Sequence, residues 1–237
     1  MSEPERVLAI SREDLFGRER ERYFQGFRTA VETDFRPYIE KNSRFLLRRE
    51  TSSEQPVDAE SDESYKQIIP YSFFVNNGKV FVYQRTKGSG EEEGEHRLFG
   101  NHSVGIGGHI NPDDAVDLKH AIGLAALREF KEEVDYIGAL TTSIVGYIND
   151  DRDSVGRVHF GVVYCINGDK PHISVKEEDR MVGRGLLDMR ELFSLENKLK
   201  GQDGEFEGWS GLVIDYFNDA IKAHFPGVLY PGHFIRR

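Results

Sequence analysis

Short apolar runs alternate with polar, glycine-containing stretches from residue 68 onward. The runs YSFFV (71–75) and VFVYQR (80–85) are rich in β-branched and aromatic residues, and the four residues NNGK lie between them. An Asn-Gly pair between two such runs predicts a β-hairpin. The runs SIVGYI (143–148) and VHFGVVYCI (158–166) predict two further strands.

A helical pattern separates these two pairs of strands. Leu127, Phe130 and Val134 recur at the spacing that places side chains on one face of a helix, so they are expected to face the core. Residues 189–199 and 210–225 are also predicted to be helical. The order of strands, helix, strands and helices predicts an α/β fold in which helices pack on a sheet.

The first third of the chain is more polar. Residues 12–32 have helical character, with Leu15, Phe16 and Tyr23 among the apolar positions. Residues 50–64 are acidic and serine-rich, and residues 86–96 are acidic and glycine-rich, so both stretches are predicted to be solvated loops. We therefore expect an N-terminal extension over residues 1–66, followed by the main domain over residues 67–237.

Composition and charge narrow the class of protein. The 237 residues are 38% hydrophobic and 30% charged, which is typical of a globular protein. A formal net charge of −10 disfavours nucleic acid polymers and anionic membranes as partners. Cys165 is the single cysteine, so no intrachain disulfide can form. There is no signal-like or membrane-length apolar run, and we expect a cytoplasmic location.

The predicted helix that contains Leu127, Phe130 and Val134 carries an unusual charged face. Glu129, Glu132 and Glu133 are three and four residues apart, so their carboxylates share one side of the helix and repel one another unless a cation binds. Such oxygen ligands suit Mg2+. The alternative is a solvated face with an Arg128–Glu132 pair worth about 0.3–0.5 kcal/mol. An upstream double glycine, Gly107-Gly108, favours the metal site because a backbone carbonyl can approach a ligand there.

At these residues the sequence resembles the Nudix hydrolase family, whose signature is G-x5-E-x7-R-E-U-x-E-E-x-G-U, where U is apolar. Gly108 matches the opening glycine, and REFKEE supplies R-E-U-x-E-E from Arg128 to Glu133. The resemblance covers roughly residues 68–199. It implies a Nudix-type α/β/α sandwich with a mixed β-sheet, preceded by the N-terminal extension.

Three departures from the signature stand out. Gly108 plus five residues leads to Asp114, a shorter carboxylate than the family's Glu. Thirteen residues (115–127) precede Arg128 where the pattern has seven, so six are inserted, and they lengthen either the loop or the helix. Asp135 replaces the second glycine of the signature, at a helix end where we expect a left-handed backbone.

The resemblance implies Mg2+-dependent hydrolysis, with Mn2+ as an alternative ion, of a diphosphate bond in a nucleoside diphosphate derivative or similar small phosphorylated metabolite. It also implies a general base that varies among members, and a homodimer is compatible with it. The implied metal ligands are Gly107, Glu129, Glu132 and Glu133, with Asp114 and Glu178 as further candidates. The implied catalytic residues are Arg128, Glu129 and Glu132, and the implied substrate-binding residues are Arg85, Arg97 and Gly108.

Two other functions remain open. A Nudix-fold binding module without hydrolysis would explain the altered signature, although the intact glutamate cluster argues against it. A chemistry like that of isopentenyl-diphosphate isomerase is suggested by SVGIGGHI, but it would need a cysteine near the glycines, and Cys165 lies in a predicted strand. His102, His109 and His159 are interpreted as structural residues.

Overall fold

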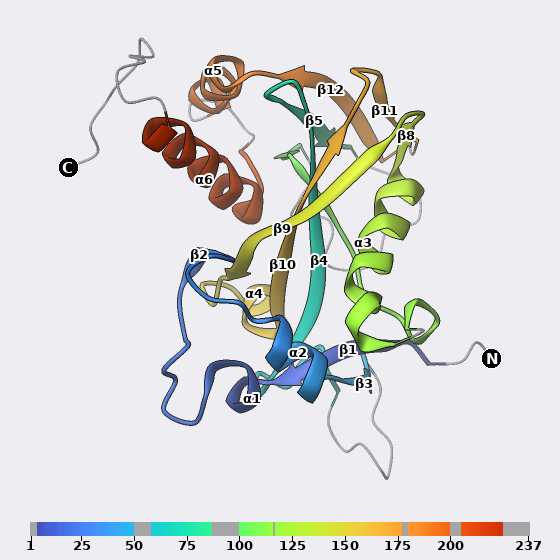
Figure 1. The fold of residues 1–237 in the computed structure, drawn as a ribbon, viewed down its shortest axis with the longest axis vertical. Helices are drawn as coiled ribbons and strands as arrows, with labels where there is room; N and C mark the ends of the chain where they lie inside the picture. The colour runs from blue at the N-terminus through green and yellow to red at the C-terminus, as the bar shows by residue number, and fades with distance from the viewer. Residues whose placement is uncertain are drawn as a thin grey trace.

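One long strand organises the sheet. The computed structural model describes residues 4–49, 58–86, 100–115, 117–176, 180–199 and 205–224. In it, β4 (Tyr65–Asn76) pairs in parallel with β10 (His159–Gly168) along most of its length. Its other edge meets three antiparallel partners in turn: β1 near its start, β7 in its middle and β5 at its end. The sheet is therefore mixed, with β4 and β10 at its centre (Figure 1).

The main path of the sheet runs β12-β5-β4-β10-β9-β2, and β1, β3, β6 and β7 pair beside it. A separate pair is formed by β8 and β11. The remaining strands are β1 (Arg6–Ser11), β2 (Gly26–Thr29), β3 (Arg44–Leu47), β5 (Lys79–Arg85), β6 (His102–Ser103), β7 (Gly105–Gly107), β8 (Val134–Tyr136), β9 (Leu140–Asn149), β11 (Ile173–Val175) and β12 (Met181–Leu187).

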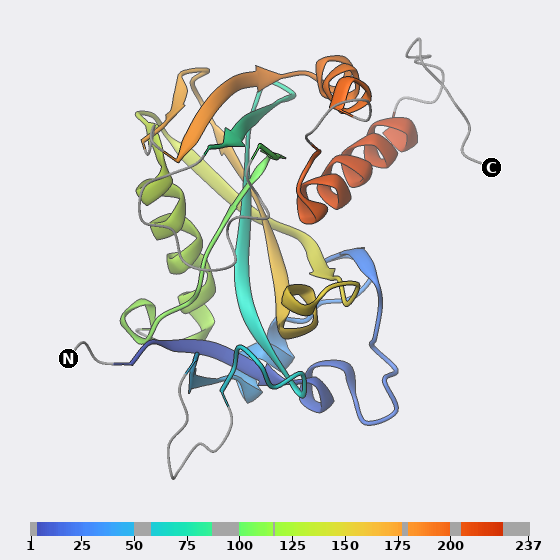
Figure 2. The same ribbon diagram turned by 180° about the vertical axis from the view of Figure 1, so that it is seen from behind.

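Helices cover both faces of this sheet. Figures 1 and 2 show α3 (Leu118–Glu133) on one side and α6 (Gly208–His224) on the other, with α5 (Met189–Leu199) near α6. The smaller helices are α1 (Arg12–Phe16), α2 (Arg36–Asn42), α4 (Ser154–Val158) and the 3-10 turn η2 (Pro112–Asp114). This is the α/β/α sandwich with a mixed sheet that the sequence predicts.

The alternating side chains of β10 explain why both faces need a cover. Phe160 and Val162 pack with buried alanines of α3, whereas Val163 packs with Val213 and Ile214 of α6. Successive strand residues point to opposite faces, and here both sets are apolar. The two helical layers therefore bury β10 from both sides.

The hairpin between β4 and β5 is confirmed. Its turn residues Asn77 and Gly78 have φ values of 48° and 73°. Two positive φ angles in succession define the tight turn that matches the twist of paired strands, and Asn-Gly adopts it at low cost. The strands predicted at residues 143–148 and 158–166 and the helices at 189–199 and 210–225 are also confirmed, as β9, β10, α5 and α6.

The helix expected over residues 12–32 is wrong. Helix α1 ends at Phe16, and Gly17 then has a φ of 87°. A left-handed residue cannot continue a right-handed helix, so the chain turns and forms β2 from Gly26. The apolar Leu15 and Phe16 still join the main core.

Residues 1–66, expected to be an extension, contribute strands to the main sheet. Strand β1 pairs with β3 and with the start of β4, and the expected boundary after residue 66 falls within β4. Asp58 and the residues after it lead into β4, and Ala59 is fully buried. Residues 50–57 and 87–96 of the two predicted loops lie outside the described residues.

The six inserted residues lengthen the helix. The side chain of Asp117 caps α3 by accepting from the His120 backbone N–H at 2.9 Å, and the helix then runs from Leu118 through Arg128. Phe130 is buried and Leu127 is half-buried. At the far end, the expected left-handed Asp135 is wrong, because the chain passes from Glu133 straight into the extended strand β8. An extended residue has no need for glycine.

Within the described residues, no helix is both long and apolar enough to cross a membrane.

Candidate active site

Arg128 lies at the centre of a polar cluster on α3. Its Nε and Nη2 donate to the two carboxylate oxygens of Asp114 at 2.8 and 2.9 Å. Its Nη1 donates to Glu129 at 2.8 Å and to Glu132 at 3.1 Å. These hydrogen bonds, that of Asp114 first, raise the pKa of Arg128. We call Arg128, Asp114, Glu129 and Glu132 the Arg128 cluster.

Asp114 is therefore placed as a partner of Arg128. Its side chain is 7% exposed, and Oδ2 also accepts from the Asn111 backbone N–H at 2.9 Å. Burial would raise the pKa of Asp114, but the hydrogen bonds of Arg128 outweigh it and lower the pKa. With both oxygens bound to a guanidinium, this shorter carboxylate fixes Arg128 from the loop that precedes α3.

The double glycine faces the same cluster. A Cβ atom on Gly108 would lie 2.2 Å from the carboxyl carbon of Glu129, so any larger residue would displace this carboxylate from its present position. The next residue, His109, accepts a hydrogen bond from Arg128 Nη2 through its carbonyl oxygen at 2.9 Å. Gly107 is held in β7, opposite Tyr71 of β4. The turn and the helix are thus joined by packing and by hydrogen bonds.

The three glutamates have different surroundings. The side chain of Glu129 is 15% exposed, and burial raises its pKa. Glu132 is 56% exposed. Glu133, at the end of α3, is half-buried, and its charge is among the groups that raise the pKa of Arg85 against the opposing effect of burial. Their oxygens are not gathered within 4.8 Å of one another, because Arg128 lies between Glu129 and Glu132.

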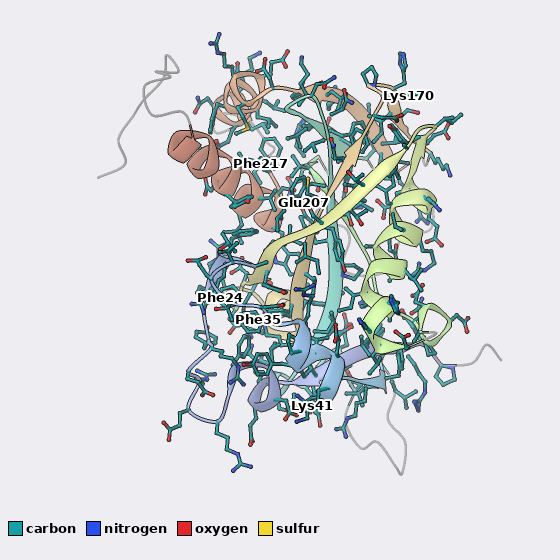
Figure 3. All side chains as sticks on the ribbon, in the orientation of Figure 1. Phe24, Phe35, Lys41, Lys170, Glu207 and Phe217 are labelled. Carbon is teal, nitrogen blue, oxygen red and sulfur yellow. The ribbon has the colours of Figure 1, made fainter. Side chains whose placement is uncertain are left out.

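Arg85 lies at the end of β5 with a partner that the sequence did not reveal. Its Nε donates to Glu207 at 2.6 Å, and the other oxygen of Glu207 accepts from Ser103 Oγ at 2.8 Å. Glu207 lies near the centre of the molecule, next to the start of α6 (Figure 3). Backbone hydrogen bonds between His102 and residues 205 and 207 fix its position.

No sequence pattern could have identified Glu207, because it is 122 positions from Arg85 and belongs to no motif. Two of the predicted site residues, Arg97 and Glu178, lie outside the described residues. Cys165 is on β10, on the α6 side of the sheet, and burial raises the pKa of its thiol to about 11. A protonated thiol away from the glycines does not support the isomerase chemistry.

Two of the three histidines interpreted as structural lie side by side. The rings of His109 and His159 have centroids 5.8 Å apart. Burial lowers the pKa of His109 to about 3 and also lowers that of His159, so both imidazoles are neutral at physiological pH.

Comparisons with known proteins concern the chain and its fold as a whole. No model of a known protein family matches the chain. Protein YmaB of Bacillus subtilis (strain 168) is 32% identical over 220 residues, which cover 89% of this chain and 96% of that protein. The crystal structure of Tm1382, a candidate Nudix hydrolase, superimposes with a TM-score of 0.69 at 26% identity, over 91% of this chain and all of that one.

Two more distant structures also align. DR0079 from Deinococcus radiodurans covers 64% of this chain with a TM-score of 0.43 at 16% identity. A NUDIX family hydrolase from Clostridium perfringens covers 67% with a TM-score of 0.41 at 14% identity.

Proposed function

Because the chain belongs to the Nudix hydrolase family, we propose that it is a Mg2+-dependent enzyme that hydrolyses a diphosphate bond. The substrate we propose is a nucleoside diphosphate derivative or a similar small phosphorylated metabolite. The observation that carries this proposal is the contact of Gly108 with Glu129, which joins the glycine turn to the acidic face of α3.

The donor atoms fit such an ion. Glu129, Glu132 and Glu133, with the carbonyl of Gly107, offer only oxygen ligands, which Mg2+ prefers and Mn2+ accepts. When bound, the ion would neutralise diphosphate charge and lower the pKa of water. The match to the family signature and these oxygen ligands support a metal at this end of α3, which would draw the glutamate oxygens together.

The protein's own groups would position the reactants. Arg128 holds Glu129 and Glu132 in fixed orientations, and Asp114 fixes Arg128 in turn. Arg85 carries a positive charge near Glu133 and would bind phosphate oxygens, while Glu207 holds its guanidinium in place. Burial raises the pKa of Glu129, and a carboxylate with a raised pKa is a stronger base, so Glu129 is a candidate proton acceptor for the attacking water.

The test is a hydrolysis screen. The purified chain is incubated with a panel of nucleoside diphosphate derivatives, with and without Mg2+, and the products are identified by mass spectrometry. We expect Mg2+-dependent release of product from at least one compound, and its loss in Glu132→Gln and Glu133→Gln. Undiminished turnover in both variants would disprove the metal assignment.

The alternative function, a binding module without hydrolysis, predicts a different result. It would show metal-independent binding of a nucleotide-like ligand by calorimetry and no turnover with any ion. The cytoplasmic location, the homodimer and the absence of polymer or membrane partners stay predictions.

A further inference from the structure

We propose that Glu60, His109 and His159 form a second metal site, for a transition-metal ion such as Zn2+, separate from the glutamates of α3. One ligand atom of each residue lies within 4.8 Å of the others. The three residues come from distant parts of the chain: the turn before β4, the loop after β7 and the first position of β10. We call them the histidine cluster.

His159 presents a free nitrogen to this cluster. Its Nδ1 lies 2.6 Å from the carbonyl oxygen of Val155, and a carbonyl can only accept, so Nδ1 carries the proton. The neutral ring therefore has its lone pair on Nε2. A histidine whose other nitrogen donates to a carbonyl is the arrangement typical of metal-binding imidazoles. The residue is 7% exposed, which holds the ring in place.

His109 supplies the observation that points most directly to a ligand. Its Nε2 is buried and has no hydrogen-bond partner in the structure. On the opposite side of the ring, Nδ1 is 3.7 Å from a carboxylate oxygen of Glu5. Buried polar atoms without a partner are rare because burial removes their hydrogen bonds to water and no protein hydrogen bond replaces them. A cation between the two imidazoles would satisfy this nitrogen.

Glu60 is oriented in the same way by outer partners. Its Oε2 accepts from Arg48 Nε at 3.0 Å and from Gln67 Nε2 at 3.1 Å. This leaves Oε1 as the oxygen that can reach an ion. The charge of Glu60 and the nearby Glu5 together offset Arg48, which bonds to both. Glu60 and His159 thus have hydrogen-bonded partners behind them, as in known metal centres, and His109 has the carboxylate of Glu5 nearby.

The ligand set selects the kind of ion. Two imidazole nitrogens and one carboxylate suit Zn2+ and similar transition metals, whereas Mg2+ prefers oxygen alone. Tetrahedral ligands at about 2.0–2.1 Å from zinc lie about 3.4 Å apart. Small side-chain rotations would bring the present atoms to that separation. A fourth position would be left for water.

Such an ion would connect two parts of the molecule. Glu60 belongs to the segment that leads from the N-terminal strands into β4, and His109 follows the glycine turn of the proposed active site. The His109 carbonyl accepts from Arg128, so a metal on its ring would fix the peptide that also positions Arg128. We infer that the ion would hold the loop after β7, and with it the peptide that positions Arg128, against the segment before β4.

Metal analysis of the full chain tests this. The protein is purified without an affinity tag, stripped with a chelator, equilibrated with Zn2+ and dialysed, and its metal content is measured by mass spectrometry. We expect one Zn2+ per chain in the wild type and in the Glu132→Gln/Glu133→Gln double variant. His109→Gln and His159→Gln should each lose it. His172→Gln, at an exposed histidine, is the matched control and should retain it.

Thermal unfolding and Co2+ spectra keep the test decisive if a histidine variant folds poorly. At free Zn2+ roughly 100 times the Kd, the Tm of the wild type should rise by about 5–10 °C, and that of the conservative Glu60→Gln should rise less. Co2+ should give a tetrahedral absorption band that Glu60→Gln weakens. Equal Zn2+ content in all variants and the control, or none in the folded wild type, would overturn the proposal. Neither result depends on hydrolysis, so the proposed function is tested separately.

Discussion

Two cations, Arg128 and Lys66, are held in similar ways in very different surroundings. Each is bound by carboxylate and backbone oxygens: Arg128 by Asp114, Glu129, Glu132 and the His109 carbonyl, and Lys66 by Asp151 and the carbonyls of Gly156 and His159. The Arg128 side chain is 30% exposed, whereas that of Lys66 is fully buried.

Their pKa values respond in opposite directions. The hydrogen bond that Arg128 donates to Asp114 and the charges of the other carboxylates raise the pKa of Arg128, while burial lowers that of Lys66 to about 8 in spite of Asp151. The Arg128 cluster is partly exposed, so it can receive a charged ligand. Lys66 is closed to solvent, so it and its partners can only hold the fold together. The histidine cluster lies between them, since Arg128 binds the His109 carbonyl and Lys66 binds that of His159.

Asp151→Asn should have the largest effect, and it acts on stability. Lys66 would remain buried without a charged partner, so we expect the free energy of unfolding at pH 7 to fall by about 3–5 kcal/mol. The measurement is urea denaturation, with Asp135→Asn, at an exposed aspartate, as the matched control. A loss no larger than that of the control would show that the buried pair contributes nothing.

Asp151 should also make the free energy of unfolding depend on pH, and Asp151→Asn should remove this dependence. Despite opposing burial, hydrogen bonds from Arg12 and Lys66 lower the pKa of Asp151 to about 2 from 3.8. A lowered carboxylate pKa stabilises the fold above pH 3.8, and this contribution disappears as the pH falls through about 2. Discounted for solvent screening, it amounts to about 1–2 kcal/mol. In urea denaturation measured as a function of pH, the free energy of unfolding of the wild type should therefore fall by about 1–2 kcal/mol more than that of Asp151→Asn as the pH falls from about 4 through about 2.

Gly108→Ala should disrupt the Arg128 cluster while leaving Lys66 and its partners intact. The new methyl group would displace the Glu129 carboxylate, which lies 2.2 Å from the position of its Cβ. We expect kcat/KM to fall by about 10–100-fold, the range found when groups supporting a metal site are disturbed. The measurement is steady-state hydrolysis of the substrate found in the screen. Full activity would mean that Glu129 need not stay where the structure places it.

How far the sequence could predict these clusters depends on how local their contacts are. The Asn77-Gly78 turn, strand β10 and the apolar face of α3 were predictable, because each depends on residues a few positions apart. The end of α1 at Phe16 was not predictable, because Gly17 takes a left-handed conformation that the apolar spacing does not record.

Long-range partners account for the rest. Glu207 is 122 residues from Arg85, and Lys66 is 85 residues from Asp151. Only the folded sheet, in which β4 and β10 run side by side, brings such groups together. Asp114 is an intermediate case: its position in the signature was recognised, but its bidentate contact with Arg128, 14 residues away, required the structure.

Arg128→Lys would show how far the Arg128 cluster depends on the shape of its cation. A lysine keeps the charge but has one compact ammonium in place of a planar fork, so it cannot donate to both oxygens of Asp114 and to two glutamates. We expect kcat/KM to fall by about 10-fold. The loss of about one buried hydrogen bond should also cost about 1–3 kcal/mol of stability.

Arg18→Lys is the matched control, because the Arg18 side chain is 88% exposed and bonds only to Glu13 among the contacts seen. It should leave both activity and stability unchanged. If Arg128→Lys behaved like this control, charge alone would hold the cluster. The Zn2+ content of Arg128→Lys should stay at the wild-type level, since only the His109 carbonyl, and not its ring, contacts Arg128.

Gly123→Ala should have the smallest effect, and in the opposite direction. Gly123 lies on α3 like the glutamates, but a Cβ there would meet only the hydroxyl of Tyr164, at an ordinary 3.7 Å. Because alanine is a better helix former than glycine, we expect the free energy of unfolding to rise by about 0.5–1 kcal/mol with kcat/KM unchanged. Urea denaturation and the hydrolysis assay measure both. A loss of activity here would mean that a methyl group anywhere on α3 disturbs the site, so the effect of Gly108→Ala could not be assigned to Glu129 alone.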